Sequence, residues 1–302
     1  MDFLSFIIIC VKVLLVFAGT LLTVLIMVYA ERRVSAFMQG RLGPNRVGPQ
    51  GLLQPIADGI KFLMKEDIIP DGVNKPIYLL APVIMLIPAL MTFAVIPFGS
   101  TITLFDRDII LQVADVNIGI LYILALTSIG VYGIVLAGWA SNSKYTLIGG
   151  LRSSAQLISY ELALGLSVVS IILMSGSLRL NDIVADQQGY FLSWYVFKQP
   201  LAFLIFLIAT YAETNRLPFD LAEAEQELVG GYHTEYSSMK FAMFFMSEYA
   251  NMITAAALTV TLFFGGWDVP LLDEKSLGIW GAMLSVVSFI LKMGFFLFLF
   301  IW

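Results

Sequence analysis

The sequence predicts an all-α integral membrane protein with about seven transmembrane helices and one short amphipathic helix at the membrane surface. Of the 302 residues, 59% are hydrophobic and only 13% are charged, and the mean hydropathy is +0.87, which is typical of a chain that crosses a bilayer repeatedly. The apolar residues form long continuous runs, whereas a transmembrane barrel would alternate polar and apolar residues. Because no repeat or low-complexity segment divides the chain, we expect one membrane domain over residues 1–302.

Seven apolar runs approach or exceed the length of about 20 residues that a helix needs to cross the hydrocarbon core of a bilayer. They cover residues 3–30, 77–98, 116–138, 153–175, 199–213, 240–264 and 277–302. In the second run, Pro82, Pro88 and Pro97 predict a kinked helix or an early end, because proline interrupts the helical hydrogen bonds.

Residues 54–65 predict a short amphipathic helix in the loop after the first run. The charged residues Asp58, Lys61 and Lys65 lie outside its apolar face. The apolar residues at helical spacing are Ile56, Ile60, Leu63 and Met64. Such a helix lies at the membrane surface. It acts either as an interfacial packing element or as a doorway for a lipid-soluble molecule, and the pattern favours neither alternative.

Basic residues in the loops predict the orientation of the chain. Segment 31–75 holds seven Lys or Arg residues, and the loops expected on the same side add Lys144, Arg152, Arg216 and Lys240. The opposite loops hold only Arg107, Arg179, Lys198 and Lys275. By the positive-inside rule, segment 31–75 faces the cytoplasm, or the matrix if the protein is mitochondrial, and the N-terminus lies outside.

The inventory of side chains argues against a resident electron carrier. Cys10 is the only cysteine and His233 the only histidine, so an iron–sulfur, haem or zinc site cannot be assembled from them. The turn-rich stretch 41–49 lacks the lysine and hydroxyl of a nucleotide-binding phosphate loop. We therefore expect no metal, flavin or nucleic acid on this chain, and any electron-carrying centre should belong to a partner.

The stretch 212–231 concentrates acidic residues in a chain that is otherwise mostly apolar. Its five carboxylates within fifteen residues are Glu213, Asp220, Glu223, Glu225 and Glu227. Like charges at this density raise one another's pKa, so several can exchange protons near neutral pH. A solvated loop is the alternative, since most charge runs are solvated faces. The recurrence of carboxylates in neighbouring apolar runs favours proton exchange.

Three ionisable residues lie inside apolar runs, namely Glu161, Glu248 and Lys292. A charge in lipid costs several kcal/mol unless it is paired, protonated or hydrated. Lys292 can pair with one carboxylate but not with all of them, so a hydrated acid chain is favoured over a structural ion pair. From their distances along the predicted helices, these residues and Glu213 are expected in the cytoplasmic half of the membrane. Glu31 would end the first helix on that side, and Lys12 would be nearly alone in the outer half.

Five stretches of sequence resemble one known family. They are AERR at 30–33, GPNRVGP at 43–49, LQPIADG at 53–59, GWASNSKY at 138–145 and the stretch 212–231. Collinearly over nearly the whole chain, they resemble the quinone-site membrane subunit of respiratory NADH:quinone oxidoreductase (complex I), called subunit 1 in mitochondria and the H subunit in bacteria. The resemblance implies a subunit without its own redox centre, at the joint between the hydrophilic and membrane arms. It would form much of the quinone chamber and its lipid entrance.

The resemblance also implies roles for single residues. Arg41, Asp58, Arg216 and Phe219 match positions around the quinone tunnel. The coupling carboxylates of the family match Glu161, Glu213, Glu223, Glu225, Glu227 and Glu248. Glu31 and Lys292 join this expected proton relay because of their predicted depth.

Ligand, partners and membrane follow from the same resemblance. Quinone would be a bound substrate, and the partners would be other membrane-arm subunits, the lipid bilayer and the hydrophilic-arm subunits that complete the quinone site. The membrane would be the bacterial plasma (inner) membrane, with the mitochondrial inner membrane as the alternative. Family members usually add an eighth helix after the seventh. Because this sequence stops at Trp302 while still apolar, we expect the eighth helix to be truncated or carried by a separate chain.

Two other functions remain open at this point. The first is a membrane anchor of a related hydrogenase-type complex, which would need the carboxylates but no quinone. The stretch Pro218-Phe219-Asp220-Leu221 resembles the quinone branch instead. The second is a free-standing ion transporter, but the inverted repeats and broken helices of such proteins are not visible in the sequence.

Overall fold

The computed structural model describes residues 3–104, 107–223, 230–270, 272 and 278–302. Among these residues, six helices are long and apolar enough to cross a membrane. They are α1 (Phe3–Met38), α3 (Lys75–Met91, continued by the 3-10 turn η2, Thr92–Val95), α4 (Gly119–Ala140), α5 (Lys144–Ser175), α9 (Ser238–Phe263) and α10 (Ile279–Ile301). A seventh apolar helix, α8 (Pro200–Glu213), has only 14 residues. The seven segments coincide with the seven predicted runs and confirm the all-α fold class.

Shorter elements connect these helices. The amphipathic segment predicted at 54–65 forms α2 (Gln54–Met64), and its four apolar residues are all exposed. Two strands, β1 (Ile102–Leu104) and β2 (Arg107–Ile109), make an antiparallel hairpin in which Ile102 lies opposite Ile109. The remaining pieces are α6 (Leu180–Ala185), α7 (Tyr195–Lys198) and the 3-10 turns η1 (Pro49–Gly51), η3 (Phe191–Ser193), η4 (Asp220–Ala222) and η5 (Gly231–His233).

Two helix boundaries differ from the hydropathy boundaries. Helix α1 does not end at Glu31 but continues to Met38, and α5 begins at Lys144 rather than near residue 153. Hydropathy marks the part of a helix that suits lipid, whereas the backbone hydrogen bonds of a helix continue through polar residues. The early end predicted from proline is confirmed for α3, whose 3-10 continuation stops at Val95, before Pro97.

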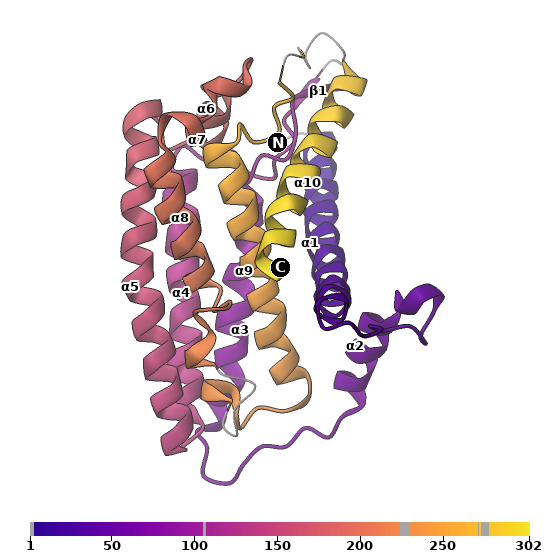
Figure 1. Ribbon diagram of the computed structural model, residues 1–302, viewed down its shortest axis with the longest axis vertical. Coiled ribbons are helices and arrows are strands. Elements are labelled where there is room, and N and C mark those ends of the chain that lie inside the picture. The colour runs from indigo at the N-terminus through magenta and orange to yellow at the C-terminus, as the bar shows by residue number, and fades with distance from the viewer. Residues whose placement is uncertain (1–2, 105–106, 224–229, 271, 273–277) are drawn as a thin grey trace.

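Glycines bring α3, α4 and α5 together side by side (Figure 1). A Cβ atom on Gly138 of α4 would lie 2.6 Å from the carbonyl oxygen of Thr146 in α5. A Cβ on Gly133 would lie 3.0 Å from the carbonyl oxygen of Ala81 in α3. Small residues allow this close approach of backbones, which supplies the packing energy between helices in lipid.

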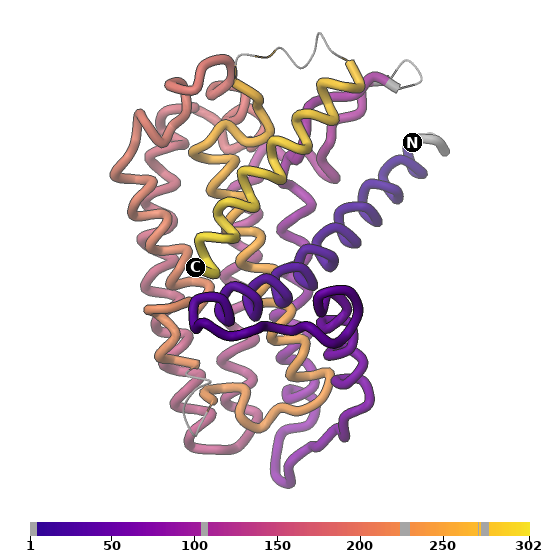
Figure 2. Tube along the Cα trace, turned by 45° about the vertical axis from the view of Figure 1, so that its right-hand side comes forward, coloured from indigo at the N-terminus to yellow at the C-terminus, as the bar shows by residue number. Residues whose placement is uncertain are grey.

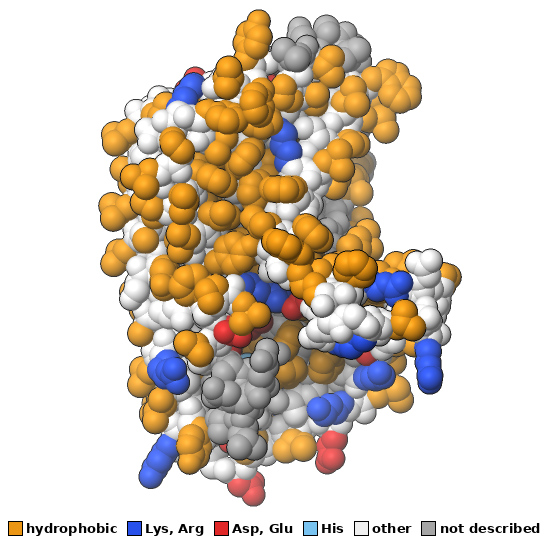
Figure 3. Space-filling view, viewed as in Figure 1, with side chains coloured by type: hydrophobic (Ala, Val, Ile, Leu, Met, Phe, Trp, Pro, Cys, Tyr) orange, Lys and Arg blue, Asp and Glu red, His pale blue; other side chains and the backbone are white. Residues whose placement is uncertain are grey.

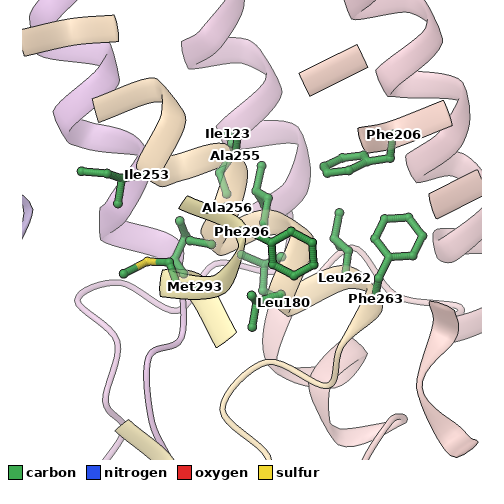
Figure 4. Packing of buried hydrophobic residues seen from close by; sticks show 14 of the residues in the cluster. Ile123, Leu180, Phe206, Ile253, Ala255, Ala256, Leu262, Phe263, Met293 and Phe296 are labelled. Atoms are coloured by element: carbon green, nitrogen blue, oxygen red, sulfur yellow. The ribbon is translucent and has the colours of Figure 1, made fainter. Parts of the chain in front are cut away.

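Helix α9 is the centre of the bundle. Most of its side chains are buried, and it packs against α1, α2, α3, α8 and α10. Figure 4 shows part of the hydrophobic core around α9. The side chains that meet there include Ala255, Ala256 and Phe263 of α9, Ile123 of α4, Phe206 of α8 and Phe296 of α10. In contrast, α1 runs obliquely across the upright helices (Figure 2).

Two ends of the bundle are distinguished below. The α2 end carries α2, the starts of α3, α5 and α9, and the described part of the acidic loop (Figure 1). The acidic loop is residues 214–237, of which 214–223 and 230–237 are described. The opposite end carries the N-terminus, the hairpin, α6 and α7. Helix α2 lies at the side of the bundle, where the ring centroid of its Phe62 is 6.1 Å from that of Phe241 in α9. It is joined to α3 by the strap, defined as residues 65–74.

Candidate functional site

Three carboxylates from three helices line one small cavity. Glu161 of α5, Glu213 at the end of α8 and Glu248 of α9 surround a space of about 30 Å³. This volume is enough for water, and the lining also contains the polar side chains of Thr127 and Asn251. The structure therefore brings together three of the predicted proton-relay residues around a polar space inside the bundle.

Each of these three carboxylates has a neutral hydroxyl partner. The hydroxyl of Ser128 donates a hydrogen bond to Glu161, and Thr127 contacts Glu213 in the same way. The phenol of Tyr232 donates to Glu248 Oε1 at 3.2 Å. Burial raises the pKa of Tyr232 well above its ordinary value, so this phenol stays protonated and acts as a donor.

Because helix α8 is short, the non-helical backbone that follows it lies beside the small cavity. Its last residue is Glu213, and Asn215 adopts a positive φ of 47° that turns the chain away from the helix. Non-helical backbone inside a membrane protein must be satisfied by protein or by a water-filled cavity. The side-chain amide of Gln156 in α5 does this, because its Nε2 lies within hydrogen-bond distance of the backbone oxygens of Ala212 at 3.1 Å and Phe219 at 2.8 Å. The side-chain Oδ1 of Asn215 is also 3.1 Å from this nitrogen.

A second, larger cavity of about 430 Å³ adjoins the first. Thr214, Asn215 and Glu248 line both cavities, so the acidic residues form a connected polar region. Figure 3 shows acidic and basic side chains together in a hollow at mid-height, below a face covered by hydrophobic side chains. The charged residues of this larger cavity are Glu31, Arg216, Asp220, Glu223 and Glu248.

An ion pair between α1 and the acidic loop lines the larger cavity. The Arg216 guanidinium donates to both carboxylate oxygens of Glu31, at 2.6 and 3.2 Å. The Tyr249 hydroxyl donates to the same carboxylate, and its ring lies 5.3 Å from the Arg216 guanidinium carbon. Bidentate geometry makes such a pair both strong and orientation-specific. Glu31 and Arg216, which were expected in the relay and in the quinone tunnel respectively, are thus direct partners.

The acidic loop contributes one described residue of the predicted relay, Glu223. Glu223 is 7% exposed, and the side-chain amide of Asn215 donates a hydrogen bond to its Oε1. Glu225 and Glu227, the other two predicted relay residues of this loop, lie outside the described residues.

Among the described residues, the four that were expected around the quinone tunnel lie in different surroundings. Asp58 on α2 is held by Arg32 of α1, by Gln54 at 3.0 Å and by Lys61 at 3.2 Å. Burial opposes ionisation of Asp58, but the hydrogen bonds from Gln54 and Lys61 and the charge of Arg32 outweigh it and hold its pKa below the usual value.

Arg41 and Phe219 lie in other surroundings. Arg41 is exposed, and its Nε bonds Gln39 at 2.7 Å. Phe219 packs edge-on against Tyr160 of α5, with ring centroids 5.2 Å apart. Of the four residues assigned to the quinone tunnel, only Arg216 lines the larger acidic cavity.

Lys292 lies far from the carboxylates with which the sequence groups it. Its ammonium donates to the backbone carbonyls of Phe264, Gly266 and Asp268, at 2.9, 3.1 and 2.7 Å. These residues follow the end of α9, about 24 Å along the helix axis from Glu248. The expectation that Lys292 shares the half of the bundle that holds Glu248 is therefore wrong. Helix α10 starts beyond the level at which α9 ends (Figure 1). Lys292, in the middle of α10, therefore lies at the level of the end of α9. Its part in a relay stays a prediction.

Several polar residues of the site were not found from the sequence. Gln156, Tyr232 and Tyr249 hold the acidic loop and its carboxylates in place. Neutral polar residues inside or next to an apolar run would have been the signal, but they are too common in membrane helices to stand out. Among the described residues, no group of three or more His, Cys, Asp or Glu side chains is arranged to hold a metal.

Comparisons with known proteins identify one family. The family model described as NADH dehydrogenase matches residues 11–302. The NADH-quinone oxidoreductase H subunit numbered 2 from Geobacter metallireducens is 60% identical over 270 residues, which cover 86% of this chain and 78% of the relative. The H subunit numbered 2 from Koribacter versatilis is 53% identical over 304 residues, covering 97% and 86% of the two chains.

A third relative carries a different subunit name. NADH-quinone oxidoreductase subunit 8 from Rhodothermus marinus is 54% identical over 297 residues, which cover 95% of this chain and 84% of the relative. Both the family match and these identities extend over nearly the whole chain. The chain is therefore a membrane protein that belongs to the NADH dehydrogenase family.

Proposed function

We propose that this chain is the H subunit of a proton-pumping NADH:quinone oxidoreductase and works there as one membrane domain. It helps to form the quinone chamber and its entrance, and it couples quinone reduction to a path of carboxylates in the membrane arm. The observation that carries the proposal is the connected pair of cavities at the α2 end, which joins Glu161, Glu213 and Glu248 to Glu31 and Arg216.

The chemistry of quinone reduction fits these cavities. A quinone that gains two electrons must also collect protons, so its reduction next to titratable carboxylates can drive their rearrangement. Carboxylates that share water and hydroxyl partners can exchange protons with one another, whereas a single buried ion pair cannot. The proposed path continues through Glu223, Glu225 and Glu227. The proposed quinone site contains Asp58, Arg41, Arg216 and Phe219.

Partners and membrane follow from the same proposal. The hydrophilic-arm subunits would complete the quinone site and deliver its electrons, and other membrane-arm subunits would receive the charge that this chain passes sideways. The membrane is the bacterial plasma membrane, with the mitochondrial inner membrane as the alternative. The N-terminus lies outside, which puts the α2 end in the cytoplasm or matrix.

Asp58→Asn in the intact complex tests the entrance. We expect slower quinone reduction with NADH, because the carboxylate that fixes α2 to Arg32 is neutralised, while electron transfer from NADH to a soluble artificial acceptor stays unchanged. Asp71→Asn, an exposed position on the strap, is the matched control. Equal loss of both activities would make α2 an assembly element instead.

Proteoliposomes test the direction of proton movement. The purified chain alone should show no proton flux under an imposed potential, because the proposed path leads to a partner rather than across the bilayer. A steady proton current that Glu213→Gln removes would overturn the proposal and favour an ion transporter.

A further inference from the structure

Lys240, in the first turn of α9, belongs to neither cavity and yet is a buried cation. Its side chain is only 9% exposed, and its Nζ lies 2.6 Å from Asp67 Oδ1 of the strap. This contact is an ion pair without hydrogen-bond geometry. The ammonium also lies 5.0 Å from the centre of the Tyr78 ring in α3. A lysine is rarely buried to this degree unless specific partners compensate for the lost water.

Asp67, the carboxylate partner of Lys240, connects it to α2, the helix at the proposed quinone entrance. The strap that contains Asp67 follows α2 directly. The same first turn of α9 holds α2 and the strap through two serines: Ser238 Oγ donates to Phe62 O at 2.8 Å, and Ile68 N donates to Ser237 Oγ at 3.0 Å. The position of α2 is therefore fixed against the start of α9.

The aromatic partner of Lys240 connects it to the acidic loop. Tyr78 stacks on Tyr236, with ring centroids 4.2 Å apart and planes 7° from parallel. The Tyr78 hydroxyl donates to Glu235 O at 2.7 Å, and the Tyr236 hydroxyl donates to Tyr78 O at 3.2 Å. Tyr78 is fully buried, so its ring cannot move without displacing the end of the acidic loop, which also carries Tyr232, the donor to Glu248.

We propose that Lys240 is a positioning residue that couples the place of the doorway helix α2 to that of the acidic loop. Its ammonium is the point where the two sets of contacts meet, because it pairs with the strap on one side and with the stacked tyrosines on the other. Entry of a quinone beside α2 would shift the strap, and Lys240 would transmit this shift to the loop that holds Glu223 and the donor of Glu248. This role rests on the proposed function.

A kinetic experiment in the intact complex tests the coupling. Lys240→Met keeps the length of the side chain and removes the charge. We expect a several-fold higher KM for quinone and fewer protons pumped per electron, with NADH oxidation by a soluble acceptor unchanged. Lys240→Arg should restore both quantities, since a guanidinium keeps the charge and also stacks on aromatic rings. Lys144→Met, an exposed lysine at the same end, should change neither.

A distance measurement tests the coupling without reference to quinone. Spin labels at Lys65→Cys, where the strap leaves α2, and at Thr234→Cys are both at exposed positions. In a Cys10→Ser chain within the complex, they report the separation of the start of the strap from the acidic loop. Lys240→Met should broaden the distance distribution, and Lys144→Met should not. Asp67→Asn changes only the half-exposed partner and serves as the test variant if Lys240→Met does not assemble.

The outcomes separate the inference from the function on which it rests. An unchanged distance distribution in Lys240→Met or Asp67→Asn overturns the coupling. Broadening without any change in KM or in protons per electron also overturns it, because the contact would then be structural only. A parent complex that reduces no quinone contradicts the proposed function, while the distance distributions still decide whether Lys240 holds α2 to the loop.

Discussion

Ionisable side chains at the two ends of the bundle differ in what surrounds them. At the α2 end, Glu161, Glu213 and Glu248 share a cavity that has room for water. At the opposite end, the ammonium of Lys292 is held by three backbone carbonyls, and that of Lys12 donates to Gln112 O at 3.2 Å. A backbone carbonyl does not take up or pass on a proton, whereas carboxylates around water can exchange protons with one another. The neighbours of a charged residue, rather than its depth, therefore distinguish the two regions.

The largest effect is expected from neutralising an acid in the shared cavity. Glu213→Gln in the intact complex should lower quinone-linked pumping about 100-fold, which is the contribution of one positioned proton donor or acceptor. The vesicles should stay proton-tight, because the path leads to a partner. A pH-sensitive dye in proteoliposomes measures both quantities. Asp182→Asn, a carboxyl-to-amide change at the opposite end, is the control, and equal losses in both variants would remove the distinction between the ends.

The next largest effect concerns the ion pair between Glu31 and Arg216. Arg216→Met should destabilise the folded protein by about 3 kcal/mol, because it leaves the Glu31 carboxylate without its partner in a partly buried place. Thermal unfolding in detergent measures this loss. The double variant Glu31→Gln with Arg216→Met should recover most of the stability. If the single and double variants are equally unstable, the pair is not what stabilises this side of the cavity.

Lys292 tests the comparison from the other end. Lys292→Met should cost about 2 kcal/mol of stability, because three carbonyls lose a charged donor. The number of protons pumped per electron should not change. A variant that unfolds at the parent temperature and yet fails to pump would show instead that Lys292 is part of the relay, as the sequence suggests.

The effect that is smallest at neutral pH comes from His233, which lies in the acidic loop at the α2 end. Burial lowers its pKa to about 4 from an ordinary value of 6.5, and its ring packs against Tyr232 and Phe241. Between pH 6.5 and pH 4, the His233 ring is protonated in the unfolded chain and neutral in the folded chain. The stability that depends on the neutral ring is complete above pH 6.5 and falls by up to about 1.4 kcal/mol per pH unit between pH 6.5 and pH 4.

His233→Phe isolates this contribution, because phenylalanine keeps the aromatic contacts and does not titrate. The melting temperature of the parent should fall more steeply between pH 6.5 and pH 4 than that of the variant. Parallel curves would mean that His233 takes up its proton in the folded protein and shares the polar character of the nearby acids.

The course of the helices could be predicted from the sequence because hydropathy reports which segments suit lipid. All seven segments and the amphipathic α2 were found in this way. Glu161 and Glu248 could be singled out because a carboxylate is costly in an apolar run. The pairing of Glu31 with Arg216 spans 185 positions, and no local pattern indicates such a contact. The depth of Lys292 was misjudged because counting residues assumes that neighbouring helices start at one level.

The length of α8 has a consequence for how the chain crosses the membrane. With 14 residues it is about 21 Å long, whereas its neighbour α5, with 32 residues, is about 48 Å long. The hydrocarbon core of a bilayer is about 30 Å thick. The helix alone is too short to span this core, so the non-helical residues that follow Glu213 make up the rest of the crossing. Glu213 thus ends its helix about 9 Å short of the thickness of the hydrocarbon core.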